Sequence, residues 1–345
     1  CIRDRYKIYW EDTKMEFSAT AGTAGGSLKA LFEVRDGDNL ENFKGKVTKA
    51  DSYSLTVENI SIDNIKSLNL PDKDGKITVN NISYSYDSWE AQVDAQGNIK
   101  SVTFNLSKDK AIADPEKTVA EGYLLNAGSA INARGIPYYM TQLNEFVRNF
   151  SEMFNQIESK GQNLNGDTPP TFFEAITNTA KVYDFSESEA YSKLPDGQTA
   201  TINSSSNTYY RMTAANFSVN KDVMNDVSLF ATSTDYVKTD SCDIVDELKK
   251  LQSEKTVYRG DKAESFLETI ISNVSVDTEK AETYNKLYSN LEQTIANQRT
   301  SVSGVDEDEE ALNLVKFQHS YNMASKIISV MNQMLDKLIN DTGVA

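Results

Sequence analysis

The sequence predicts an α+β protein that combines long heptad-patterned helices with two β-rich modules, one of them inserted into a helical block. Three observations support this fold class. Apolar residues recur in steps of three and four near the C-terminus, alternate with polar residues from Val47 to Leu106, and read as strands again within 182–240. A helix places every third or fourth side chain on one face and a strand every second one, so both kinds of element are expected.

Length and charge limit the function classes. The 345 residues are enough for two or three modules, each with its own core. The chain has 35 Lys and Arg against 51 Asp and Glu, a net charge of −16. Binding to nucleic acid or to an anionic membrane surface needs clustered positive charge, so we expect neither partner. No apolar run in the sequence is long enough to cross a membrane.

The first five residues have an unusual sequence. "CIRDR" is what a common library-preparation transposon end encodes when it is translated, and we interpret residues 1–5 as a sequencing scar. The chain is then expected to be a fragment that is truncated at its N-terminus. Of the two cysteines, Cys1 would belong to the scar, which leaves Cys242 and no internal disulfide.

The first helix is expected where Leu28, Leu31, Phe32 and Arg35 follow helical spacing. Strands follow it, because apolar and polar residues then alternate between turn signals. The expected strands are "YSLTV" (53–57), "KITV" (76–79), "SYSY" (83–86) and "SVTFNL" (101–106), and the clearest turn signals are Asp74-Gly75 and Gly97-Asn98.

A second helix is expected over 136–161, with Pro137 near its start and Gly161 at its end. Its apolar face consists of Leu143, Phe146, Val147, Phe150, Phe154 and Ile157. The chain then becomes strand-like again. The expected strands here are "TATI" (199–202), "TYYRMT" (208–213) and "NFSVN" (216–220), with "LPDGQ" (194–198) as a turn.

From Lys262 the chain is expected to be helical to its end. Two runs of apolar residues step by three and four, one from Ala281 to Ile295 and one from Leu314 to Leu338. A stripe this narrow is buried only against another helix, so the second run, the assembly seam, predicts a helical partner. The assembly seam consists of Leu314, Phe317, Tyr321, Ala324, Ile328, Met331, Leu335 and Leu338.

The two runs differ in heptad phase, and the break between them falls at "SVSGV" (301–305). Gly304 interrupts the helical pattern, and Asp306 with Glu309 can form a capping box for the last helix. We therefore expect Ser303, Gly304, Asp306 and Glu309 to form a turn and a helix cap.

No enzyme, cofactor or metal site is expected. His319 is the one histidine and lies opposite the assembly seam, so a hydrolytic triad has no base that reaches a nucleophile. The five contiguous acids from Asp306 to Glu310 do not alternate with spacers as calcium ligands do, and stabilisation of a helix N-terminus explains them better. The β-rich regions could bind a glycan, but no residues in them single out a pocket.

The C-terminal segment resembles the bacterial flagellar hook-associated protein 1 family. That family has a pattern close to S-x-SGVN-x-DEE followed by L-x-x-(F/Y)-Q-x-(A/S)-Y. Asp306 stands here for the usual Asn and Glu307 for the usual Leu, so the turn can differ in detail. The residues that fit are Ser301, Ser303, Gly304, Val305, Asp308, Glu309, Glu310, Leu314, Phe317, Gln318 and Tyr321.

Three other segments resemble the same family: 25–37, 135–174 and 214–233. In the family the first two form one block, so the strands between them are interpreted as an insertion. The resemblance implies these domains: 1–43, the remnant of a helical and β middle domain; 44–133, the inserted small β domain; 134–180, a helical middle domain; 181–258, a β-rich outer domain; 259–305, the C-terminal part of the helical middle domain; and 306–345, the C-terminal axial core helix.

The resemblance also implies a function. Such a protein is a structural component of the bacterial flagellum that joins hook and filament by helical self-assembly, outside the cell, after type III export. Its partners would be identical subunits, the hook protein, a second junction protein, filament subunits beyond, and an export chaperone before secretion. The alternatives are another flagellar axial protein, such as a flagellin-like or hook subunit, and a cell-surface adhesin.

Overall fold

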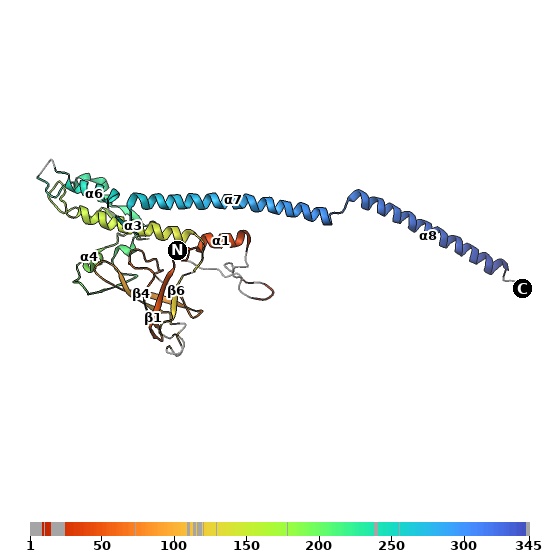
Figure 1. The fold of residues 1–345 in the computed structure, drawn as a ribbon, viewed down its shortest axis with the longest axis horizontal. Helices are drawn as coiled ribbons and strands as arrows, with labels where there is room; N and C mark the ends of the chain where they lie inside the picture. Colours follow the sequence, from red (N-terminus) through yellow and green to blue (C-terminus); the bar gives the residue numbers. More distant parts are fainter. Residues whose placement is uncertain are drawn as a thin grey trace. The chain divides into compact units, whose positions relative to one another are not determined.

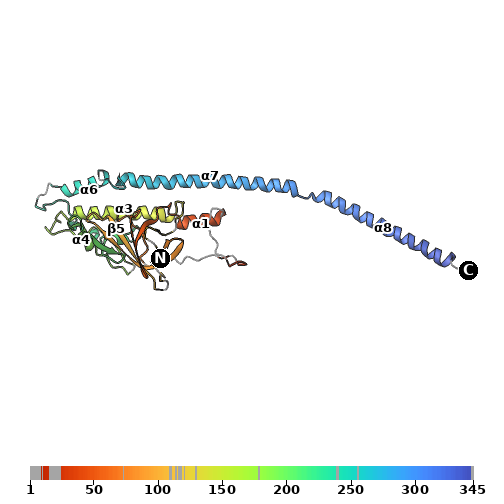
Figure 2. The same cartoon turned by 60° about the horizontal axis from the view of Figure 1, so that its bottom comes forward.

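The computed structural model describes residues 9, 11–14, 25–72, 74–108, 111–112, 115, 119, 121–128, 130–177, 179–237, 241–254 and 256–342. Within them the protein is a mixed α+β structure, as the sequence predicts (Figures 1 and 2). The chain divides into two compact units between Ile271 and Ser272. Residues 1–5, which we interpreted as a scar, lie outside the described residues.

The helices expected from the sequence are present. The segment around Leu28 forms α1, the segment after Gly135 forms α3 with Pro137 in its first turn, and the C-terminal region forms α7 and α8. The helices are α1 Gly26–Asp36, α3 Ile136–Glu158, α4 Ser186–Ser192, α5 Lys221–Asn225, α6 Asp243–Ser253, α7 Ala263–Ser303 and α8 Glu307–Thr342, with 3-10 turns η1 Tyr209–Arg211 and η2 Val227–Leu229.

Six antiparallel strands close on themselves into one sheet, the closed sheet. Its order is β3-β6-β1-β2-β5-β4, and β4 pairs back onto β3. Closure removes the unpaired edges that an open sheet would present to other chains. The strands are β1 Phe43–Asp51, β2 Ser54–Glu58, β3 Gly75–Val79, β4 Ile82–Val93, β5 Ile99–Leu106 and β6 Leu124–Ala127, followed by β7 Phe173–Ala175, β8 Ala200–Asn203, β9 Phe217–Val219, β10 Thr256–Tyr258 and β11 Asp261–Lys262.

Two turns of the closed sheet differ in how well the sequence predicts them. Gly97 has a positive φ of 79° in the β4–β5 turn, as expected. The β3–β4 hairpin instead turns at Asn80 and Asn81, both with positive φ, which is the geometry of a tight primed hairpin turn. Gly75 is not a turn residue. It begins β3 opposite Tyr86, and a Cβ at this position would lie 2.0 Å from the Tyr86 ring.

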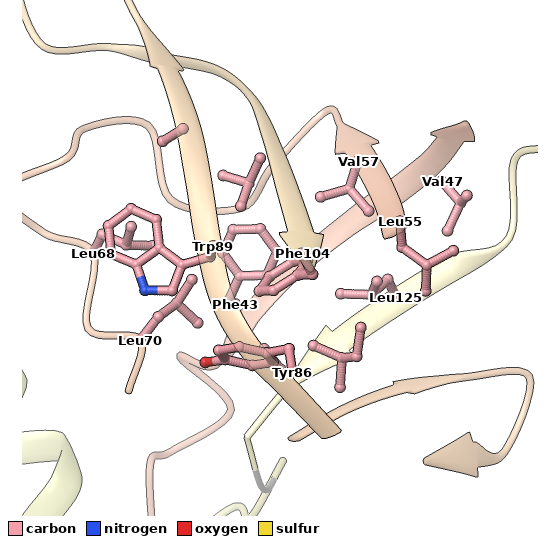
Figure 3. Close-up of a cluster of buried hydrophobic side chains, with 14 of the residues drawn as sticks. Phe43, Val47, Leu55, Val57, Leu68, Leu70, Tyr86, Trp89, Phe104 and Leu125 are labelled. Carbon is pink, nitrogen blue, oxygen red and sulfur yellow. The ribbon is translucent and has the colours of Figure 1, made fainter. Parts of the chain in front are cut away.

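The core of the closed sheet is made by the alternating inward side chains (Figure 3). Along β5, Val102, Phe104 and Leu106 are buried, and along β4 the buried set shifts register between Tyr86 and Trp89. A β-bulge at this point of β4 accounts for the shift, since one extra residue moves the following side chains to the other face.

The expectation of a separate β-rich module at 181–258 differs from the structure. Strand β8 from this region pairs with the second half of β4 and extends the same sheet to seven strands. Tyr191, Ile202 and Tyr210 belong to the core cluster of the closed sheet. The rest of the region consists of short helices and of strands β9 and β10, which pair with β7 before the region and β11 after it. A four-residue strand has too little surface for its own core, so it joins a sheet that already exists.

The predicted strand "TYYRMT" is wrong, because Tyr209–Arg211 form the 3-10 turn η1. The two tyrosines are buried in different clusters. Tyr209 stacks on Phe185, and Tyr210 meets Trp89 edge to face. In a strand, consecutive side chains point to opposite faces of one sheet. In this tight turn, the two tyrosine side chains point into two different apolar clusters.

Helix α3 buries its polar face, which the sequence pattern does not reveal. In both views α3 lies along one side of the sheet (Figures 1 and 2). The apolar face that we expected packs on several clusters, including Phe146 and Phe150 against Phe266 at the start of α7. The opposite face is also covered. Its buried members are Gln142, Asn144, Glu145, Arg148, Ser151, Glu152, Asn155 and Glu158.

Arg148 is the central residue of this polar face, with an exposed fraction of 2%. Its guanidinium donates to three backbone carbonyls, those of Met212 at 2.9 Å, Lys66 at 2.9 Å and Leu68 at 2.7 Å. It also stacks 4.5 Å from the ring centroid of Tyr210. Arg148 therefore holds two loops that are distant in the sequence against α3. Its burial lowers the pKa of its guanidinium.

Candidate assembly interface

The last helix is separated from α7 by a short break. Helix α7 ends at Ser303, whose hydroxyl donates to the Arg299 carbonyl at 2.8 Å. The amide of Gly304 donates to the Thr300 carbonyl at 2.6 Å, and a Cβ on Gly304 would lie 2.2 Å from that oxygen. Glycine is therefore the residue that allows this close approach.

Asp306 caps the N-terminus of α8. Its Oδ1 accepts from the amides of Asp308 at 2.9 Å and Glu309 at 3.3 Å, so two otherwise unpaired amides are bonded. Four acidic residues occupy the first turn of α8, where negative charge is favourable. Among the described residues, no group of three or more His, Cys, Asp or Glu is arranged to hold a metal ion.

Helix α8 contains 36 residues, which gives it a length of about 54 Å. All eight residues of the assembly seam lie on it and all are exposed. Phe317 and Tyr321 expose 74% and 75% of their surface, and Ile328 exposes 59%. The assembly seam is therefore exposed to solvent in the single chain.

A second apolar stripe lies beside the assembly seam on the second half of α8. It consists of Met323, Ile327, Val330 and Met334, again in steps of four and three, and all four are exposed. In heptad terms the seam takes positions a and d and this flanking stripe takes c and g; on the helix surface g lies next to d, and c lies next to g. We did not predict the flanking stripe, although its spacing is visible in the sequence.

The segment that carries both stripes has little charge. From Phe317 to Leu335 the one Asp, Glu, Lys or Arg is Lys326, whereas such residues make up 25% of the whole chain. The polar positions of this segment are filled instead by uncharged residues such as Asn322, Ser325 and Ser329. The first turn of α8 differs from this segment, because it is strongly acidic.

The remaining candidates do not gather into a site. His319 is exposed, as is the free thiol of Cys242. On α7, Tyr284, Leu291 and Ile295 from the first heptad run are exposed as well. In the described part of the chain, no helix is both long and apolar enough to cross a membrane.

Comparison with known proteins identifies two similarities. Residues 296–341 match the family model described as Flagellar basal body rod FlgEFG protein C-terminal. Over 341 residues, 96% of this chain, the sequence is 21% identical to Flagellar hook-associated protein 1 of Bacillus subtilis (strain 168). The chain spans 56% of the length of that relative. The family match covers α8 almost completely, together with the break that precedes it.

Proposed function

We propose that this chain, a homologue of Flagellar hook-associated protein 1, is a structural subunit of the bacterial flagellum that forms the junction between hook and filament by self-assembly. The similarity to that relative runs through 96% of the chain, and an independent family match coincides with α8. The observation that carries the proposal is the exposed apolar surface of α8, because an assembly subunit needs such a surface before it meets its neighbours.

The energetics favour assembly over a permanently solvated helix. Burying a side chain such as Leu, Ile, Phe or Met is worth roughly 1.5–3 kcal/mol. Leu314, Ile328 and Leu335 expose at least half of their surface in the isolated chain. A partner that covers the assembly seam would bury several such side chains, and their burial free energies would add. The cost of ordering the partners reduces this sum.

The two stripes of α8 suggest two kinds of neighbour. A helix in a two-stranded coiled coil buries positions a and d, so the assembly seam suits one partner helix. The flanking stripe, from Met323 to Met334, would then face a second helix. We assign it to α8 of another copy. The whole chain carries a net charge of −16, and identical chains approach most easily where flanking charge is low, as in this segment, where Lys326 is the one charged residue.

The remaining partners follow from the same proposal. They are the hook protein, a second junction protein and the filament subunits beyond, with an export chaperone that holds the C-terminal helix before secretion. The location is the flagellum outside the cell, reached by type III export. The role is structural and not enzymatic. A second candidate, another axial subunit of rod or hook type, is favoured by the family match over 296–341.

A substitution at the middle of the assembly seam tests the proposal. Ile328→Asp places a charge where an apolar contact is expected, and a loss of only 1.4 kcal/mol per contact lowers an association constant tenfold. The matched control is Ser329→Asp, which adds the same charge one residue away on the polar side of α8. Both variants replace the full-length protein in cells, and electron microscopy counts hooks that carry filaments.

We expect Ile328→Asp to reduce these filaments at least roughly tenfold and Ser329→Asp to leave them close to normal, because repeated subunit contacts multiply the loss. Thermal unfolding of the closed sheet should be the same in both variants. Normal filaments with Ile328→Asp would show that the assembly seam is not the contact surface.

A further inference from the structure

Three glutamates are buried on the polar face of α3, and they differ in how their charge is compensated. Glu145, Glu152 and Glu158 expose 3%, 3% and 1% of their surface. Glu145 forms an ion pair with Arg259 at 3.1 Å, and Glu152 forms one with Lys66 at 2.5 Å. Among the described residues, neither carboxylate oxygen of Glu158 has an ion-pair partner or a side-chain donor, and the backbone amide of Ala231 is the donor nearby. The same helix thus holds two compensated carboxylates and one that is not.

Glu158 lies where a later part of the chain docks on the end of α3. The amide of Gln162 donates to the Ser233 carbonyl at 2.9 Å, and Ile157 shares an apolar cluster with Ile244 and Leu251 of α6. The fit is close, because a Cβ on Gly161 would lie 2.6 Å from the Cβ of Ala231. We call 227–237 together with α6 the docked segment.

No cation on the packed elements is engaged with the Glu158 carboxyl in the described structure. On α6, Asp243 bonds to Thr234 and Ser241, and Glu247 pairs with Lys160 of the turn after α3. The other acidic groups nearby are Asp167, Asp226, Asp235 and Asp246, and α6 also carries Lys249 and Lys250, whose side chains are exposed. Glu158 is also the last residue of α3, where the helix dipole disfavours a negative charge.

We propose that Glu158 is a proton-operated latch, which in its neutral form allows the docked segment to stay on the end of α3 and in its ionised form weakens that docking. The physical reason is desolvation, since an uncompensated carboxylate in a buried site costs several kcal/mol and the neutral acid costs far less. Undocking would hydrate the carboxylate and remove this cost. The proposal is independent of the flagellar function.

The titration of the carboxyl agrees with the geometry. Burial raises the pKa of Glu158 from 4.5 to about 7, and the nearby Ala231 amide opposes the shift. Below pH 4.5 both the docked and undocked forms hold the proton, so docking is strongest. Between pH 4.5 and 7 the undocked form loses the proton first, and docking weakens until both forms are ionised.

Hydrogen exchange of the α6 amides, 243–253, at pH 6 and pH 8 tests the latch on the full chain. After correction for intrinsic exchange, we expect wild-type protection at pH 8 to be on the order of tenfold lower than at pH 6. Glu158→Gln keeps the shape and removes the titration, so its protection should be equal at the two pH values. Glu152→Gln is the matched control, since that carboxylate has a cation, and its pH dependence should match the wild type.

Two results would overturn the proposal: wild-type protection that does not change between the two pH values, or an unchanged pH dependence in Glu158→Gln. Difference infrared spectroscopy of the wild-type chain gives a second test that needs no folded variant. We expect a protonated-carboxyl band at pH 6 that disappears by pH 8. A spectrum without that band at pH 6 would contradict a neutral Glu158.

Discussion

Helices α3 and α8 are both long and amphipathic, but α3 is covered on both faces and α8 on neither. Helix α3 buries Arg148, Glu145 and Glu152 on its polar face, while its apolar face is also packed. Helix α8 exposes Phe317, Ile328 and the rest of its apolar surface. The amphipathic pattern alone therefore does not say which face of a helix is covered in the isolated chain.

The difference lies in what each helix meets within its own unit. The polar face of α3 meets loops whose backbone carbonyls and amides need partners, and long side chains supply them. Asn155, for example, both donates to and accepts from the backbone of Phe173 at 2.9 Å. Buried backbone groups must be bonded, so a polar helix face suits this position. In the described part of the chain no loop covers α8, and its apolar side chains are exposed.

The largest effect expected from this comparison is at Arg148. Arg148→Ala leaves three buried carbonyls without their donor, and we expect a loss of about 3–5 kcal/mol in the free energy of unfolding. Lys326→Ala on α8 is the matched control, because it removes an exposed cation and should change stability by less than about 0.5 kcal/mol. Chemical denaturation measures both. Similar losses of unfolding free energy in the two variants would contradict the claim that the polar face of α3 is structural and that of α8 is not.

A smaller effect is expected at the start of α8. Asp306→Ala removes the acceptor for two helix amides, and we expect the first turn to lose about 1 kcal/mol of stability. Hydrogen exchange of the amides of 308–312 should become faster, while the closed sheet stays unchanged. Glu310→Gln serves as a control, since the described bonds of the cap do not use its carboxylate. Equal exchange in wild type and Asp306→Ala would rule out the cap.

Much of the secondary structure follows from local chemistry. Helical spacing predicts α1 and α3, glycine predicts the turn at Gly97, and the break at Gly304 coincides with the boundary between α7 and α8. These features depend on a few neighbouring residues, so the sequence contains enough information to find them. The same holds for the assembly seam as a pattern, although the pattern alone does not identify its partner.

The features that were missed depend on contacts across the chain. Strand β8 joins the closed sheet through a pairing of Ala91 with Ile202, which no local signal announces. Likewise, Tyr209 and Tyr210 have a strand-like sequence pattern but do not form a strand. Each of them packs in a different apolar cluster, which requires a tight turn. The burial of Arg148 depends on loops at 66–68 and 212, which fold from other parts of the sequence.

The central claim is that α8 exposes its apolar surface in the single chain and buries it on assembly. Hydrogen exchange of the amides of 314–338 in the monomer and in the assembled form tests it directly, with the amides of β2 and β5 as an internal reference. We expect rapid exchange in the monomer and exchange slower on the order of a hundredfold after assembly, with the reference unchanged. Strong protection of 314–338 in the monomer, or equal rates in both forms, would contradict the claim.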